Sequence, residues 1–374
     1  MMLGLYVHIP FCRHKCLYCD FPSYAGLERY RDGYIRALCR EIAASPYAGE
    51  AADTIYLGGG TPSLLDPPAI GAILDQLRQT FRIRDGAEIT MEANPDSLDA
   101  EKAAALADCG INRLSLGIQS FSDTMLSFLG RVHTAAQGEA AIWAAYEAGI
   151  HNLSLDLMYG LPGQRPEDVR CDVGRLARLP VVHASIYSLI VEEGTQLKAG
   201  LEQGRWHLPE DTAVETMART VHDAMHDAGF HHYEISSYAK GDFESRHNSK
   251  YWTYEPYIGF GVSAHSFDGA VRWANIANIP AYIRQAGKGS VVAESVSIDD
   301  KRAVEDYCFL ALRRRVGIDY RDYARRFGRP IEADFGPVID GLVRQGLLER
   351  TPQGCCLSEE GLGYGNYVFS KFIR

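Results

Sequence analysis

The sequence predicts an α/β protein: a partial (β/α)6 barrel of the TIM type, followed by a C-terminal α+β domain that includes a winged-helix-like module. Two observations support this fold class. Apolar, β-rich runs alternate with helical segments from the start of the chain to about residue 240, as in repeated βα units around a parallel sheet. From about residue 300 the pattern predicts helices followed by a hairpin. A chain of 374 residues is long enough for such a two-part architecture.

Six barrel strands are predicted from the runs at 3–9, 54–59, 88–93, 113–119, 152–158 and 183–190. Most of these runs are apolar nearly throughout, because a barrel strand is buried on both faces. Helices are predicted between the strands at 28–44, 67–80, 99–108, 135–148 and 166–178. Gly110 and Gly149 each close one of these helices near its C-cap. Six units are fewer than the eight of a closed barrel.

The pattern changes after the sixth unit. A helix at 210–228 and a strand-like run at 231–239 are predicted, but the stretch 240–298 shows no clear period. Three helices and a hairpin around Gly354 then resemble a winged helix, a fold that often binds DNA without being restricted to that role. The predicted domains are the barrel (1–240), a junction and accessory region (241–298) and the winged-helix-like module (299–374).

Composition narrows the class of protein. A net charge of -10 and the absence of a long Lys/Arg run argue against a nucleic-acid partner. No apolar run approaches ~20 residues, so no transmembrane segment is expected, and the N-terminal stretch is broken at His8 and Pro10, unlike a secretory signal. Nine cysteines, three of them clustered, do not form the pattern of a disulfide framework. We therefore expect a cytoplasmic protein.

Three cysteines stand together directly after the first predicted strand. Cys12, Cys16 and Cys19 form a C-x3-C-x2-C motif. Three thiolates at this spacing suit an iron-sulfur cluster in which the protein leaves one iron free. A structural zinc site normally takes four ligands, and no fourth Cys or His lies at finger spacing. Three unrelated buried thiols are the remaining interpretation.

This motif resembles the signature of the radical S-adenosylmethionine (SAM) superfamily. The resemblance implies a [4Fe-4S] cluster bound by the three cysteines, with SAM on the fourth iron. Tyr18 supplies the aromatic residue that is usual before the third cysteine. In such proteins the cofactor carries the reactive chemistry and the protein orients it.

Polar and glycine residues also stand at the ends of the other predicted strands, where a parallel barrel gathers its functional groups. The second strand ends in a glycine run that continues to Thr61, and Glu92, Gln119 and Asp156 end the third, fourth and fifth. Taken singly, the glycines suit a tight turn and a carboxylate suits a helix cap. Several such ends in register favour a ligand site.

The whole chain resembles the oxygen-independent coproporphyrinogen III oxidase family, through YVHIPFC, GGGTPS, EANP, GIQSF, GRVH, DLMYGLP and the C-terminal module. The resemblance implies that SAM is contacted by eight residues: Tyr6, Gly59, Gly60, Thr61, Glu92, Gln119, Arg131 and Asp156. Their chemistry is compatible with this role, since carboxylates bind ammonium or ribose hydroxyl groups and arginine binds a carboxylate.

Two departures separate the chain from the decarboxylating oxidases. Those enzymes carry a further cysteine two residues after the cluster motif, where this chain has Phe21, and an N-terminal extension that helps to build the substrate site. Here the first cluster cysteine is already residue 12. Both features resemble the HemW-type heme chaperones of the same family, which are not expected to oxidise coproporphyrinogen.

A second motif points the same way. The run from His247 to Trp252 matches H-N-x-x-Y-W, which resembles that chaperone group. Histidine is a natural axial ligand of heme iron, and aromatic rings suit a porphyrin face, so we expect His247 to bind heme. In the alternative interpretation the motif is a domain junction in which His247 makes structural hydrogen bonds. His265 is a second candidate ligand.

Three hypotheses follow, from different classes. The favoured one is a heme chaperone that delivers heme to an acceptor such as a respiratory membrane enzyme. The second is a radical SAM oxidase acting on a porphyrinogen propionate, and the third is an iron-sulfur protein that serves as an interaction scaffold. The sequence leaves open the identity of the acceptor, whether heme is held covalently, whether SAM is cleaved productively, and the oligomeric state.

Overall fold

The computed structural model describes residues 2–374. Its first six strands form a parallel sheet in chain order, which confirms the predicted partial (β/α)6 barrel. The strands are β1 (Met2–Ile9), β2 (Ala51–Gly59), β3 (Arg82–Ala93), β4 (Arg113–Gln119), β5 (Asn152–Tyr159) and β6 (His183–Ser188). β2 and β3 begin earlier than predicted, because their first residues are partly exposed and lack the apolar run that marked the rest.

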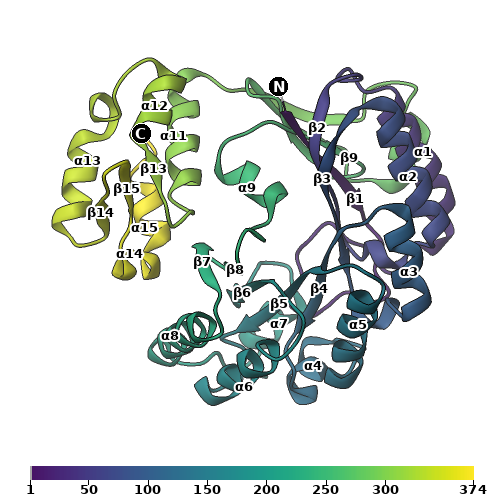
Figure 1. The fold of residues 1–374 in the computed structure, drawn as a ribbon, viewed down its shortest axis with the longest axis horizontal. Coiled ribbons are helices and arrows are strands. Elements are labelled where there is room, and N and C mark those ends of the chain that lie inside the picture. The colour runs from purple at the N-terminus through teal and green to yellow at the C-terminus, as the bar shows by residue number, and fades with distance from the viewer. Residues whose placement is uncertain (1) are drawn as a thin grey trace.

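A layer of helices covers the convex face of this sheet (Figure 1). The helices are α1 (Arg31–Ala43), α2 (Pro67–Thr80), α3 (Ala100–Cys109), α4 (Asp123–Leu129), α5 (Ala135–Glu147) and α6 (Pro166–Leu176). α2 shows why these segments are helical: proline occupies its first turn, and Ile70, Ile73, Leu74 and Leu77 recur at helical spacing and are buried. α4 was not predicted, because seven residues are too short for a clear period.

The sheet continues beyond the barrel on both sides, to twelve strands among residues 2–374. Next to β1 lies the parallel strand β9 (Tyr257–Phe260), followed by β10 (His265–Phe267), β11 (Val271–Asn275) and β12 (Val292–Ser297). The stretch that had no clear period therefore supplies four short strands. At the other edge, the predicted strand-like run 231–239 is a hairpin of β7 (His231–Glu234) and β8 (Ser237–Ala239).

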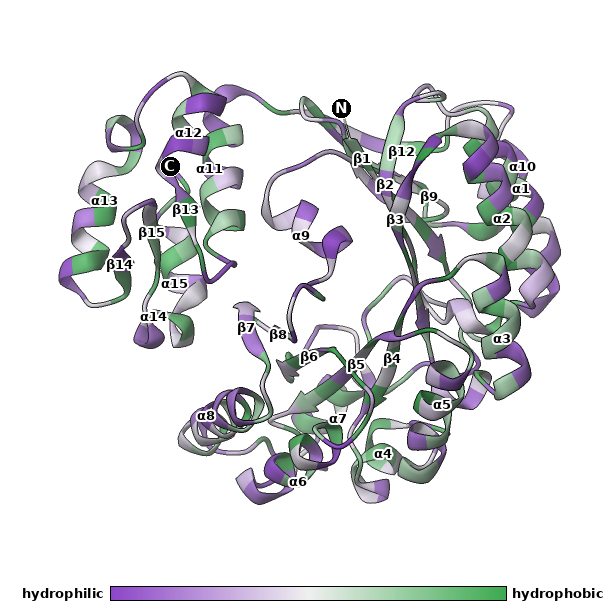
Figure 2. Ribbon diagram, in the orientation of Figure 1, coloured by the Kyte–Doolittle hydropathy of each residue, from purple (hydrophilic) through white to green (hydrophobic). Residues whose placement is uncertain are grey.

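One short helix, α9 (Arg246–Trp252), lies inside the curve of the sheet (Figure 1). Figure 2 shows it in purple and white, the colours of hydrophilic and intermediate residues, although His247 and Lys250 are buried. A polar helix in this position must find hydrogen-bond partners for its side chains. The remaining helices of this part of the chain are α7 (Gln196–Glu202), α8 (Asp211–Asp227) and α10 (Ile279–Gln285).

The C-terminal part has its own hydrophobic core. It comprises α11 (Asp300–Ala311), β13 (Ile318–Asp319), α12 (Tyr320–Phe327), α13 (Glu332–Arg344), β14 (Leu348–Arg350), β15 (Gly354–Leu357), α14 (Glu359–Gly363) and α15 (Gly365–Ser370). The first three of these helices, α11 to α13, with a three-stranded antiparallel sheet give the predicted winged-helix-like arrangement, and α14 and α15 follow it. The domain bounds at 240 and 298 stay predictions. Within residues 2–374, none of the helices is both long and apolar enough to cross a membrane.

Candidate functional site

The cysteine loop follows β1 and folds back on itself. The amide of Cys12 donates to the carbonyl of Tyr24 at 3.0 Å, and the amide of Tyr24 donates to the carbonyl of Pro10 at 2.7 Å. The amide of Cys19 donates to the carbonyl of Cys16 at 3.2 Å, which makes a tight turn between the last two cysteines. All three thiols are partly exposed at the end of the barrel where the parallel strands finish.

A chain of hydrogen bonds joins two of these thiols. The Arg131 guanidinium donates to Cys16 Sγ at 3.6 Å and to Asn94 Oδ1 at 2.7 Å. Asn94 Nδ2 donates to Thr61 Oγ1 at 3.2 Å, and Thr61 Oγ1 donates to Cys12 Sγ at 3.5 Å. Donors aimed at cysteine sulfur stabilise thiolates and tune an iron-sulfur centre.

The third thiol shares the same environment. Burial raises the pKa of Cys19, and the nearby thiols of Cys16 and Cys12 raise that pKa further. A four-iron cluster takes one thiolate per iron. Three partly exposed thiols on one loop, with hydrogen-bond donors beside Cys12 and Cys16, fit the cluster that the motif implies.

Glu92, at the end of β3, is held inside the barrel by two donors. Tyr56 donates through its hydroxyl to Oε1 at 2.8 Å, and the Gly59 amide donates to Oε2 at 3.0 Å. Burial raises the pKa of Glu92 above its ordinary value, while these hydrogen bonds and the charge of Arg113 oppose that rise. The carboxylate is fixed in place and is costly to keep ionised, as expected of a group that awaits a cationic partner.

Asp156 on β5 is a second carboxylate of the same interior and, like Glu92, it is partly buried. Ser115 donates to Asp156 Oδ1 at 3.1 Å. Burial, followed by the charge of Glu92, raises the pKa of Asp156 to about 7. Arg113, which is 1% exposed, partly offsets both carboxylates. The sequence analysis did not single out Arg113, whose signal was a charged residue at the start of an otherwise apolar barrel strand.

Gln119 ends β4 in a left-handed backbone conformation, with a φ of 69°. Its side-chain carbonyl accepts a hydrogen bond from the Tyr187 hydroxyl at 3.0 Å. Strained backbone at a strand end re-aims a side chain and is common at functional sites. Tyr187, like Asn94, takes part in the site without having been assigned a role from the sequence; both stand at the end of a barrel strand, and that was their signal.

The glycines at the end of β2 allow a close approach between strands. Gly59 has a φ of 115°, and a Cβ there would lie 2.5 Å from the His8 ring. A Cβ on Gly60 would lie 2.7 Å from the Phe11 carbonyl oxygen. Side chains at these positions would thus displace the base of the cysteine loop. The glycine run is needed for packing at the site, beyond its role as a turn.

Of the two predicted tyrosines, Tyr6 lies on β1 and Tyr18 lies within the cysteine loop. The hydroxyl of Tyr6 is 3.0 Å from His8 Nδ1, and the Tyr6 ring stacks on that of Tyr56 at 6.2 Å. Tyr18 packs against Leu129 and its neighbours beneath the loop. The structure thus brings the predicted SAM residues and the three cysteines to one end of the barrel.

His247 lies deeper. Its side chain is fully buried, Nδ1 is 2.9 Å from Thr54 Oγ1, and Nε2 is 3.0 Å from the Tyr251 hydroxyl. The ring stacks on Tyr56 at 5.2 Å. Burial and then the charges of Lys250 and Arg113 lower the pKa of His247 to about 3. In this conformation neither ring nitrogen is free to bind iron.

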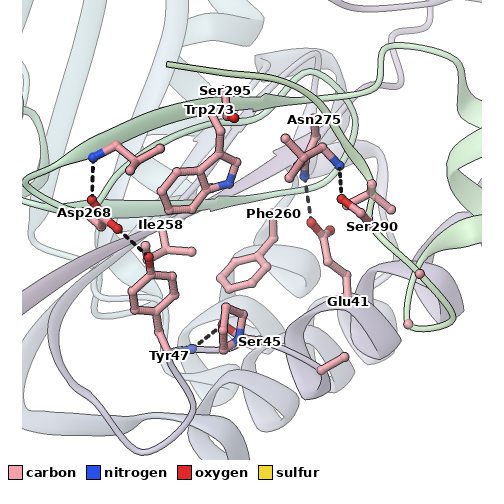
Figure 3. A pocket seen from close by; sticks show the side chains of 18 of the residues that line it. Glu41, Ser45, Tyr47, Ile258, Phe260, Asp268, Trp273, Asn275, Ser290 and Ser295 are labelled. Carbon is pink, nitrogen blue, oxygen red and sulfur yellow. Dashed lines mark hydrogen bonds between the residues drawn. The ribbon is translucent and has the colours of Figure 1, made fainter. Parts of the chain in front are cut away.

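Two cavities can be compared as candidate ligand sites. The first, which we call the mouth cavity, measures about 340 Å³ and is lined by residues that include Tyr6, Phe21, Glu92, Tyr251, Tyr257 and His265. The second measures about 840 Å³ and lies outside the barrel, beside the end of α1 (Figure 3). The carboxylates of this second cavity already have partners: Asp268 accepts from Tyr47 at 2.7 Å, and Glu41 accepts from Asn275 at 2.6 Å. Glu92 of the mouth cavity has partners as well, but only the mouth cavity is lined by predicted SAM contacts, namely Tyr6, Gly59 and Glu92, so it is the candidate ligand site.

A partial parallel barrel whose first loop presents three thiols beside a glycine run and buried carboxylates defines the class of radical SAM proteins. The Radical SAM superfamily model matches residues 6–171, and the HemN C-terminal domain model matches residues 298–363. That superfamily implies a [4Fe-4S] cluster and SAM.

Comparison with individual proteins shows to which family of this superfamily the chain belongs. The chain is 36% identical to the heme chaperone HemW of Bacillus subtilis (strain 168), over 100% of this chain and 99% of that protein. It is 34% identical to the heme chaperone HemW of Lactococcus lactis subsp. lactis (strain IL1403), over 98% and 96%. The solved structure of the radical SAM enzyme coproporphyrinogen III oxidase (HemN) from Escherichia coli shares the fold, with a TM-score of 0.87 at 23% identity over 100% of this chain and 90% of that one. The chain belongs to the HemW family of the radical SAM superfamily.

Proposed function

We propose that this protein binds heme and passes it to an acceptor hemoprotein such as a respiratory membrane enzyme. The observation that carries the proposal is the mouth cavity, whose wall includes the predicted SAM residues Tyr6, Gly59 and Glu92 and also the aromatic residues Phe21, Tyr251 and Tyr257. Flat aromatic side chains suit the face of a porphyrin. Relatives that match the chain over nearly its full length carry the name heme chaperone, in agreement with this reading of the cavity.

We further propose that Cys12, Cys16 and Cys19 hold the cluster. Glu92, Asp156 and the other predicted contacts would bind SAM at the barrel end, with Tyr56 and Ser115 holding the two carboxylates in position. When bound, the cluster and SAM supply one-electron chemistry, which the protein orients and shields from water. Arg131 places a permanent positive charge beside Cys16 and stabilises its thiolate.

A second candidate function is oxidation of a porphyrinogen propionate. The fold shared with HemN favours it, whereas Phe21 stands where the oxidases carry a cysteine. Phe21 is 62% exposed at the edge of the mouth cavity. An apolar ring at this position offers a binding surface and no redox or acid-base group.

One experiment separates the candidates. The protein is reconstituted without oxygen, titrated with hemin, and assayed in parallel with coproporphyrinogen III and SAM. We expect saturable binding of one hemin per chain and no vinyl product. Vinyl product with stoichiometric consumption of SAM would replace the chaperone proposal with the oxidase. Binding of neither hemin nor coproporphyrinogen III would favour the third hypothesis, in which the protein serves as an interaction scaffold.

The predicted role of His247 as axial ligand stays a prediction, to which the structure adds a condition. One of its bonds, to Thr54 or to Tyr251, must open before a nitrogen can reach iron. Loss of the heme Soret band in His247→Ala, with the cluster retained, would support that role.

A further inference from the structure

Three histidines lie in or near the mouth cavity, and they differ in what their ring nitrogens contact. His8 has Tyr6 at 3.0 Å from Nδ1 and the Pro22 carbonyl at 2.8 Å from Nε2. His247 is occupied in the same way by Thr54 and Tyr251. The His265 side chain lines the cavity and is exposed, and among residues 2–374 neither of its ring nitrogens has a hydrogen-bond partner.

The backbone under His265 is held firmly. It is the first residue of β10 and pairs with Ala274 of β11. The carbonyl oxygen of His265 packs so closely on Gly259 that a Cβ there would lie 2.2 Å from it. Ser263, two residues earlier, adopts a left-handed conformation with a φ of 53° and also lines the cavity. A ligand presented from such a strand needs little reorganisation to bind a metal centre.

The aromatic part of the cavity wall near His265 suits a flat, apolar ligand with an anionic edge, while Tyr6, Gly59 and Glu92 form the part of the wall that is predicted to bind SAM. Tyr251 and Tyr257 meet edge to face, with ring centroids 4.6 Å apart, and Phe21 stands at the cavity rim. At that rim Lys15 Nζ is 3.4 Å from the Phe21 carbonyl oxygen. An ammonium group at this place can pair with a carboxylate on the ligand edge.

We propose that the mouth cavity is the heme site and that His265 is the axial ligand of the heme iron. This inference rests on the proposed function, because it names the residue that would hold the cargo. The aromatic walls would contact the porphyrin face, and Lys15 would meet a propionate. His247 would then support the cavity from below, through its bond to the Tyr251 hydroxyl.

The test is an anaerobic titration with hemin, followed through the Soret band, of wild type, His265→Ala, His247→Ala and His226→Ala. His226 is a matched control, because its side chain is 81% exposed and it lies on α8. We expect His265→Ala to weaken hemin binding at least tenfold and to shift the Soret band, and added imidazole to restore the wild-type spectrum. His226→Ala should behave as wild type. His247→Ala should keep the wild-type position of the Soret band, because His265 still binds the iron; loss of the band in His247→Ala but not in His265→Ala would make His247 the ligand and overturn the assignment.

A parallel titration with metal-free protoporphyrin IX reports on the cavity without iron coordination. His265→Ala should bind this probe within about twofold of wild type, which also shows that the variant is folded. If His265→Ala keeps the wild-type Soret band and hemin affinity, the ligand assignment is overturned. If wild type itself shows no saturable hemin binding, the proposed function fails instead, so the two failures are distinguishable.

Discussion

At the scale of single residues, three ionisable side chains lie together in the barrel interior: Arg113 is buried, and Glu92 and Asp156 are partly buried. Burial raises the pKa of both Glu92 and Asp156, and the charge of Glu92 raises the pKa of Asp156 further. Arg113 is buried beside them, and its Nε has no hydrogen-bond partner among residues 2–374. The interior thus carries an electrostatic cost in the absence of a ligand. A cationic ligand such as the sulfonium and ammonium groups of SAM would relieve that cost.

Asp156 gives a prediction in which affinity and stability change in opposite directions. Its pKa of about 7 lies above the ordinary value of 3.8, so the folded protein holds this proton more tightly than the unfolded chain does. The unfolding free energy of the SAM-free protein therefore decreases as pH rises from about 4 through 7. Asp156→Asn should raise that free energy at pH 8 by on the order of 2–4 kcal/mol, while weakening SAM binding roughly tenfold to a hundredfold.

Urea unfolding at pH 5 and pH 8, together with SAM titration of the reconstituted protein, measures both effects. Asp75→Asn is the control, since that side chain is 65% exposed. An Asp156→Asn protein that binds SAM as well as wild type would place the nucleotide elsewhere.

The cysteines give a second prediction at this scale. We expect no cluster to assemble in Cys12→Ser, Cys16→Ser or Cys19→Ser, because the protein supplies only three thiolates and the cluster needs all of them. Cys171→Ser should have no effect, since Cys171 is exposed on α6. Iron and acid-labile sulfide per chain, measured after anaerobic reconstitution, decide the matter. A full cluster in Cys16→Ser would refute the assignment.

The position of candidate site residues could be predicted from sequence where they stand at a strand end. Glu92 and Asp156 do lie together in this way, because parallel strands bring their ends to one edge, and their role in binding SAM stays a prediction. Arg113 and the packing role of Gly59 were not found, because both depend on what lies across the barrel. For His247 the motif left a ligand role and a structural role open, since its spacing does not show which atoms the ring nitrogens meet.

At the scale of elements, α9 connects the centre of the barrel to the mouth cavity. His247 stacks on Tyr56, which in turn donates to Glu92. His247→Phe should keep the ring but leave Thr54 and Tyr251 without their partner, at a cost of about 1–3 kcal/mol near neutral pH. Urea unfolding of the apo protein measures this cost, and His226→Phe is the exposed control.

The same variant changes the response to acid. The pKa of His247 is about 3, below the ordinary value of 6.5, so between these two pH values the histidine is protonated in the unfolded chain and neutral in the folded protein. Stability is therefore lost as pH falls from about 6.5 toward 3. His247→Phe should reduce the slope of that loss by up to about 1.4 kcal/mol per pH unit. An unchanged slope would mean that His247 is not buried as a neutral ring.

The end of β2 supports a prediction with a closely matched control. Gly59→Ala and Gly86→Ala both place a side chain at a positive φ, 115° and 71°. The new Cβ at Gly59 would collide with His8, whereas the one at Gly86 would meet nothing within 4 Å. We expect Gly59→Ala alone to lower the cluster yield and the SAM affinity. Equal behaviour of the two variants in iron content and SAM titration would argue against this packing role.

Whether a helix or strand could be predicted depended on the length of its sequence pattern. The six barrel strands and the longer helices were predictable, because apolar runs and helical spacing extend over enough residues to be distinct. The strands β9, β10 and β11 have three to five residues each. Their place in the sheet is set by pairing with residues far away in the chain, which no local period reveals.

At the scale of the whole molecule, the C-terminal part docks on β7 and α9. The Ile235 amide donates to the Arg313 carbonyl at 3.0 Å, and the Arg313 guanidinium lies 4.4 Å from the centre of the Trp252 ring. Arg313→Ala should remove a cation–π contact worth about 1–2 kcal/mol and increase hydrogen exchange in β7 and α9. Arg325→Ala is the control, because that side chain is 74% exposed. Unchanged exchange in Arg313→Ala would show that backbone pairing alone holds the module.

The place of β1 in the sheet affects the order of events during synthesis. β1 is the first strand to leave the ribosome, yet one of its two neighbours is β9, which ends at Phe260 of 374 residues. Pairing across so long a stretch closes a large loop and is slow compared with local contacts. The cysteine loop follows β1, so one edge of β1 stays unpaired until the other five barrel strands and β9 have been synthesised. Iron-sulfur insertion into this protein should therefore follow the synthesis of β9, and a nascent chain arrested before β9 should fail to retain a cluster.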